Sequence, residues 1–272
     1  MSSSQGPYAF HRPGERVEGL EEHIIRGVEA IKDYYLAEGY QHYVANRLRP
    51  LGVEVRAAEV EGALILSYAY HDIAKAAEPY QSDVMRGRGA PGHEIVSARM
   101  TYIALWEGAL RLPEPLAWAC VKAVALHMGA MRESPDQSAI AALRILERAN
   151  RDAFIMDEVV TSWFEDLLRR CWHINELPTP ALPETEVVIS REDLRRFVAS
   201  CLSPRLRGSS EYTAEDLATL LLLHPIILAD EIAVATNIGR EPRRWAKDFT
   251  DGVREARKYR PVATGWGTSH RT

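Results

Sequence analysis

Apolar residues recur at helical spacing along most of the chain. The period of about 3.6 residues predicts helices over residues 20–38, 40–48, 57–77, 93–110, 116–128, 137–148 and 152–171. Strand patterns are weak and short, and they occur only at residues 53–56 and 186–190. The pattern therefore predicts an all-α fold.

Two further helix starts are marked by side chains that can cap backbone N–H groups. Ser190 is followed three residues later by Asp193, and Thr213 is followed in the same way by Asp216. The second pair opens a long apolar helix that continues to about residue 238 and contains Pro225, which should kink it. The proline-rich stretch 175–188 reads as a linker or a surface loop.

These elements indicate one large domain over residues 20–258. Residues 1–19 are rich in Ser, Gly and Pro, and we interpret them as a flexible N-terminal arm. Residues 259–272 are interpreted as a flexible tail. Within the domain, residues 137–190 read as an insertion and linker that could cover one side of a core site.

The composition and the net charge limit the kinds of molecule that this protein is expected to bind. The 272 residues are 46% hydrophobic and 26% charged, which is typical of a globular protein. A formal net charge of -5 argues against a protein that coats nucleic acid through overall basicity, so any such contact must be local. The few, widely spaced cysteines and the lack of a signal-peptide pattern or membrane anchor indicate a cytoplasmic protein.

Four histidines lie on or beside apolar helical segments, not in polar loops: His23, His71, His93 and His127. One histidine on such a face is usually a hydrogen-bonded core residue. Four together, with Asp72 directly after His71, favour a metal site. An aspartate can bridge two cations about 3.5–4 Å apart, which then clamp a phosphate and activate water. Divalent ions, one or two per site, are expected, with Mn, Mg, Ni, Co and Fe as candidates.

The order of the motifs adds a stronger signal. After His23 the chain reads HDIAK at 71–75, GHE at 92–94, LH at 126–127 and LADEIA at 228–233. This order resembles the HD superfamily of metal-dependent phosphohydrolases, and it looks most like the stand-alone HD nuclease subunit (double-prime type) of type I CRISPR interference. The resemblance runs from about residue 23 to residue 237 and implies an HD-domain helical bundle with a metal site at its centre.

The resemblance also implies a ligand set. A first metal ion would be held by His23, His71, Asp72 and Asp230. Asp72 would bridge to a second ion, completed by His93 and His127. Nucleases of this family usually have two consecutive histidines at the second of these positions, whereas Met128 follows here. That departure leaves the second ion in question, or with one ligand supplied by water.

Three basic residues are candidates for contact with a phosphate. Lys75 follows Asp72 by about one helical turn and so could meet the scissile phosphate beside the catalytic His71 and Asp72, although an ordinary salt bridge to Glu78 explains it equally well. Arg86 and Arg88 lie in the glycine-rich loop before the third histidine. This loop could hold a phosphate backbone or simply be solvated.

The function implied by the resemblance is cleavage of single-stranded DNA during CRISPR interference, by endonucleolytic cutting with exonucleolytic trimming as a further activity. No GxxxxGK[ST] phosphate loop is present, so a separate helicase subunit and a CRISPR effector complex are the expected partners. An HD-type nucleotidase acting on small nucleotides has the same fold and remains an alternative. A non-catalytic scaffold subunit is the alternative from another class.

Overall fold

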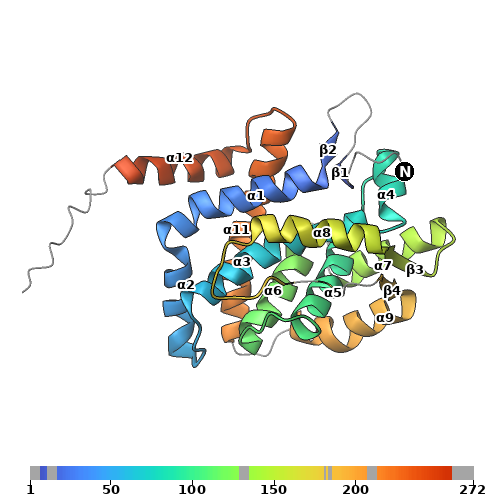
Figure 1. Cartoon of the computed structure of the whole chain (residues 1–272), viewed down its shortest axis with the longest axis horizontal. Helices are drawn as coiled ribbons and strands as arrows, with labels where there is room; N and C mark the ends of the chain where they lie inside the picture. Colours follow the sequence, from blue (N-terminus) through green and yellow to red (C-terminus); the bar gives the residue numbers. More distant parts are fainter. Residues whose placement is uncertain are drawn as a thin grey trace, which may run out of the picture.

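The computed structural model describes residues 7–10, 17–128, 135–180, 182, 186–206 and 213–258. Within these ranges most of the chain is helical, and the helices pack as one bundle with two small antiparallel sheets at its edge (Figure 1). The all-α expectation is confirmed.

Five helices form the centre of the bundle: α1 (Leu20–Tyr34), α3 (Ala57–His71), α5 (His93–Trp106), α6 (Glu114–Leu126) and α11 (Ala214–Asn237). α11 packs against α6 and α1, and α6 also packs against α5 and α3. α3, α5 and α6 bury most of their length on every side. Such helices are apolar all round because they are enclosed by other helices.

α11 is long and apolar enough to cross a membrane by length and composition alone. In this fold its apolar residues are largely buried against α6 and α1. Thr213 accepts a hydrogen bond from the Asp216 N–H, and the Asp216 carboxylate accepts one from the Thr213 N–H, which confirms the expected capping box. Lys122 of α6 donates to the same aspartate at 2.6 Å and so joins the two helices.

Shorter elements surround the bundle. The helices among them are η1 (Leu36–Glu38), α2 (Tyr40–Leu48), η2 (Arg49–Leu51), η3 (Ile73–Ala76), α4 (Tyr80–Met85), α7 (Pro135–Arg148), α8 (Glu158–Cys171), α9 (Arg191–Arg196), η4 (Phe197–Leu202), α10 (Ser203–Leu206) and α12 (Arg244–Lys258). β1 (Tyr8–Phe10) pairs with β2 (Glu18–Gly19), and β3 (Ala153–Met156) pairs with β4 (Val187–Ser190). Glu78 exchanges two backbone hydrogen bonds with Ile155, so β3 is joined to the segment that follows η3.

Several elements differ from the prediction. Residues 53–56 form no strand, and none of the strands in the described ranges pairs with them. The strand expected at 186–190 is present as β4, and its partner β3 replaces the start of the helix expected at 152–171. Burial alternates along β3, so each of its side chains faces either the core or the surface. α12 was not predicted.

The ends of the chain also differ from the expected arm and tail. Within residues 1–19, the described residues 7–10 and 17–19 contain β1 and β2, so this part is not irregular. Glu18 is 2% exposed. The expected tail, residues 259–272, lies outside the described residues.

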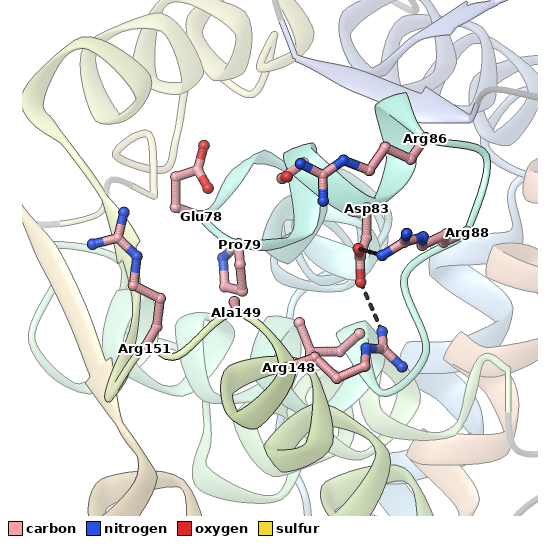
Figure 2. A pocket seen from close by; sticks show the side chains of 10 residues that line it. Glu78, Pro79, Asp83, Arg86, Arg88, Arg148, Ala149 and Arg151 are labelled. Carbon is pink, nitrogen blue, oxygen red and sulfur yellow. Dashed lines mark hydrogen bonds and ion pairs between the residues drawn. The ribbon is translucent and has the colours of Figure 1, made fainter.

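A pocket of about 300 Å³ lies between α4, the loop that follows it and the end of α7 (Figure 2). Its wall includes Glu78 and Pro79, which lead into α4. Tyr80, the first residue of α4, stacks on Phe154 of β3 with ring centroids 4.8 Å apart. The pocket is therefore built on segments that the core holds in place.

Gly27 allows α1 to approach α3, because a Cβ atom at this position would overlap the ring of Tyr68. Gly27→Ala should destabilise the protein by about 1–3 kcal/mol through overpacking, measured as a lower midpoint of urea unfolding. Gly252→Ala in α12 is the matched control, since no atom lies within 4 Å of its added Cβ. It should leave stability unchanged or raise it by up to about 1 kcal/mol. Equal stability of both variants would contradict close packing at this site.

Candidate metal centre

All five central helices deliver a side chain to one point in the core. α1 contributes His23 and the end of α3 contributes His71, with Asp72 directly after it. α5 begins with His93, α6 is followed by His127, and Asp230 comes from the middle of α11. The six residues expected as ligands from the sequence therefore meet in the structure, where they form two groups that share one aspartate.

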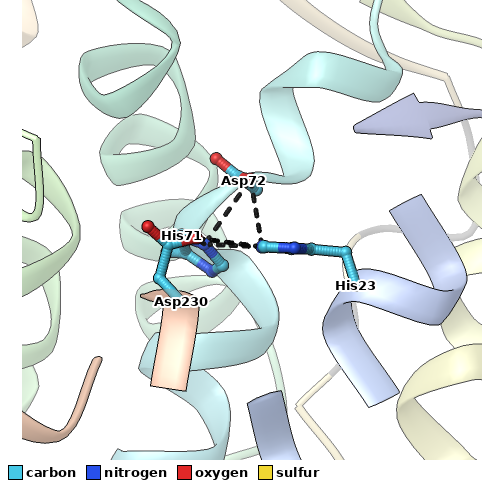
Figure 3. A group of neighbouring side chains, drawn as sticks. All are labelled: His23, His71, Asp72 and Asp230. Atoms are coloured by element: carbon cyan, nitrogen blue, oxygen red, sulfur yellow. Dashed lines mark hydrogen bonds and ion pairs between the residues drawn. The ribbon is translucent and has the colours of Figure 1, made fainter. Parts of the chain in front are cut away.

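The first group contains His23, His71, Asp72 and Asp230 (Figure 3). The His23 Nε2 atom lies 3.3 Å from Asp230 Oδ1 and 3.4 Å from Asp72 Oδ2. It also lies 3.3 Å from His71 Nε2. Donor atoms about 2.1 Å from a common ion are roughly 3.0–3.5 Å apart, so this spacing fits one metal ion.

The second group contains Asp72, His93 and His127. His93 Nε2 lies 2.8 Å from Asp72 Oδ1, and His127 Nε2 lies 3.8 Å from the same oxygen. All three atoms are buried, and none has a hydrogen-bond partner within the described chain. Leaving such atoms unpaired costs about 1–3 kcal/mol each. A divalent cation fits as their common partner.

The histidine rings are oriented with Nε2 inward. His71, His93 and His127 each donate Nδ1–H to the backbone carbonyl three residues earlier, at 2.5, 2.6 and 2.7 Å. Because the proton is then on Nδ1, the lone pair on Nε2 faces the other ligands. The local backbone therefore selects the tautomer that can bind a metal.

The fourth ring, His23, depends on a side chain instead. Its Nδ1 lies 2.9 Å from Glu18 Oε1, and that oxygen also accepts a hydrogen bond from Asn237 at 2.6 Å. Burial acts to raise the pKa of Glu18, but the hydrogen bond and charge of His23 outweigh it and lower the pKa. Glu18 was not among the expected site residues, because it stands in the expected arm, outside any helical pattern. β2 therefore supports the metal centre.

The carboxylates of the centre are held ionised. Burial acts to raise the pKa of Asp72, but the charges of Lys75 and the neighbouring histidines hold that pKa well below its usual range. Burial also acts to raise the pKa of Asp230, but the hydrogen bond from His23 outweighs burial and holds that pKa far below its usual range. Both side chains are thus ready to bind a cation.

The histidines differ in their protonation. Burial acts to lower the pKa of His23, but hydrogen bonds to Asp230 and Glu18 raise it to about 10. Burial, with the nearby rings of His71 and His93, lowers the pKa of His127 to about 3. Without an ion, His23 therefore carries a proton that a metal would displace, whereas His127 is neutral.

Lys75 lies beside the shared aspartate. Its Nζ atom is 2.5 Å from Asp72 Oδ2, and its side chain is 17% exposed. The expected alternative partner, Glu78, lines the pocket of Figure 2 instead. Lys75 thus places a positive charge at the edge of the metal centre.

Three other residues lie outside the two groups. Met128 is 41% exposed and belongs to neither group, so His127 is the one histidine that the end of α6 brings to the second group. Arg86 and Arg88 line the pocket between α4 and α7, and neither is within ion-pair distance of Asp72 or Asp230. If Arg86 and Arg88 bind substrate, as expected from the sequence, they do so at this pocket and not at the six residues of the metal centre.

Comparison with known proteins identifies the fold. No protein-family profile matches the chain, and no curated protein matches its sequence. A solved structure does match: the CRISPR-associated Cas3 HD domain protein from Methanocaldococcus jannaschii, with a TM-score of 0.52 and 24% identity over 77% of this chain and 95% of that chain. The chain has an HD-domain fold. The expected HD-domain bundle with a His/Asp cluster at its centre is confirmed.

The two groups predict two ions per chain. After incubation with Mn²⁺ and removal of the excess, elemental analysis should find two ions in the wild type and one in His127→Ala. Asp72→Asn should retain neither, because the aspartate belongs to both groups. His42→Ala, an exposed histidine in α2, is the control and should keep two. A wild type that holds only one ion, and a His127→Ala variant that keeps it, would show that the second group binds none.

Proposed function

We propose that this protein is a metal-dependent nuclease that cleaves single-stranded DNA in CRISPR interference. The observation that carries the proposal is the pair of ligand groups that share Asp72 at the centre of an HD-domain fold. Two adjacent divalent ions are suited to in-line displacement at phosphorus. The Cas3 HD domain protein of similar fold is described as CRISPR-associated, which favours that context for this chain.

One carboxylate, that of Asp72, would take part in holding both ions. Asp72 Oδ2 faces His23 and His71, whereas Asp72 Oδ1 faces His93 and His127. Divalent cations at the two groups would neutralise phosphate charge and lower the pKa of a water molecule. The chain holds the donors in place beforehand, so little reorganisation is needed when substrate binds.

The substrate is expected to approach where the centre is most exposed. The Asp230 side chain is 31% exposed and that of Lys75 is 17%, whereas each of the other five is 6% or less. Lys75 therefore lies on the accessible side, where its ammonium can contact a non-bridging phosphate oxygen. A helicase subunit and the effector complex would deliver the single strand to this side of the centre.

Cleavage of circular single-stranded DNA tests the proposal. Purified protein with added Mn²⁺, Mg²⁺ or Ni²⁺ should yield linear fragments, and samples without metal should yield none, as judged by denaturing gel electrophoresis. Asp72→Ala should abolish cutting while circular dichroism shows an intact fold. Release of phosphate from free nucleotides without cutting of DNA would instead identify a nucleotidase. No hydrolysis of either substrate by the metal-loaded wild type would indicate a non-catalytic subunit.

Lys75→Met should lower kcat for DNA cleavage by about 100-fold, because a charge that stabilises the transition state is lost. The bound ions should remain, since Lys75 belongs to neither ligand group. Lys247→Met removes a surface lysine that pairs with Glu241 and is the matched control. An unchanged kcat in Lys75→Met would limit this lysine to a structural ion pair.

A further inference from the structure

Four basic side chains surround the pocket between α4 and α7: Arg86, Arg88, Arg148 and Arg151 (Figure 2). Two carboxylates, those of Glu78 and Asp83, line it with them. The pocket is therefore positively charged on a chain whose formal net charge is -5. A local basic surface of this kind is what an acidic protein needs in order to contact nucleic acid.

Asp83 fixes two of the arginines. Its Oδ2 atom lies 2.7 Å from Arg148 and its Oδ1 atom lies 3.5 Å from Arg88, while its side chain is 11% exposed. The carboxylate offsets the repulsion between the two guanidinium groups and holds them at the pocket. Both arginine side chains remain more than half exposed, at 54% and 57%.

The guanidinium groups of the other two arginines, Arg86 and Arg151, are not paired with a described carboxylate. Neither Arg86 nor Arg151 makes a side-chain ion pair or hydrogen bond to any residue that the structure describes, and both are exposed. Guanidinium groups bind phosphate through paired N–H donors, and such charge-assisted bonds are stronger than neutral ones. These two side chains are therefore available to a phosphate ligand.

The pocket is connected to the metal centre by short stretches of chain. Glu78 follows Asp72 by six residues, and Arg88 precedes His93 by five. The backbone reaches at most about 3.6 Å per residue, so the Cα atoms of Arg88 and His93 are no more than about 18 Å apart. One strand of nucleic acid can extend over this distance.

We propose that this arginine pocket binds the phosphate backbone of single-stranded DNA, a few nucleotides from the bond cut at the metal centre; the proposal rests on the function proposed above. The exposed arginines suit a strand that passes over the surface better than a small ligand enclosed by protein. Arg86 and Arg151 supply contacts that do not depend on sequence.

Binding of a fluorescent single-stranded oligodeoxynucleotide, measured by anisotropy in EDTA, tests this without any cleavage. Arg86→Ala/Arg151→Ala should raise Kd at least about 10-fold at low salt. The slope of log Kd against log salt concentration should fall by about 1.4, because each lost phosphate contact contributes about 0.7. Arg47→Ala/Arg244→Ala removes the same charge from α2 and α12, away from α4 and α7 in Figure 1, and should leave both values unchanged.

Each other outcome overturns the proposal. An unchanged Kd and slope in Arg86→Ala/Arg151→Ala would exclude the pocket as a DNA site, and an equal loss in the control pair would show nonspecific attraction. Arginine-dependent binding of inorganic phosphate or a mononucleotide, with no effect on the oligonucleotide, would make this a small-anion site. Because the experiment measures binding and not cleavage, arginine-dependent DNA binding would support this proposal even if the protein failed to cut DNA.

Discussion

The carboxylate of Asp72 is the constraint on which the centre depends, because its two oxygens face different groups of donors. Consecutive residues on a regular α-helix point about 100° apart, so His71 and Asp72 could not both face one ion from within such a helix. α3 ends at His71, and Asp72 has φ −113° and ψ 1°, outside the helical region. This change of backbone direction turns the carboxylate toward its neighbours.

The rest of the fold is arranged around that point. α3 is buried along its length, so its end lies in the interior, not at the surface. α1, α5, α6 and α11 enclose it and each brings one donor. Buried charges need partners, and here the carboxylates, the His23 proton and the Lys75 ammonium compensate one another in the absence of an ion. Even so, the centre leaves three buried polar atoms without partners in the described chain: Asp72 Oδ1, His93 Nε2 and His127 Nε2.

The central helices, and the meeting of the six expected ligands, were predictable because helical periodicity and the motif order both persist over long stretches of sequence. Glu18 was not, since its role arises from contacts with His23 and with Asn237, which is 219 residues away. β3 was missed for a similar reason: its four residues become a strand only by pairing with β4. The sequence pointed to Arg86 and Arg88 in the loop after α4, but only the fold brings Arg148 of α7 and Arg151, in the turn before β3, to the same pocket.

Three imidazoles in the centre donate a hydrogen bond to a backbone carbonyl three residues earlier. A side-chain substitution cannot delete a carbonyl group. The sequence next to these histidines can therefore drift during evolution without turning the rings, provided that the helix ends stay in place. The ring of His23 has no such freedom, because one carboxylate supports it. Many substitutions next to His71, His93 and His127 should therefore be tolerated, whereas few should be tolerated at Glu18, which supports His23.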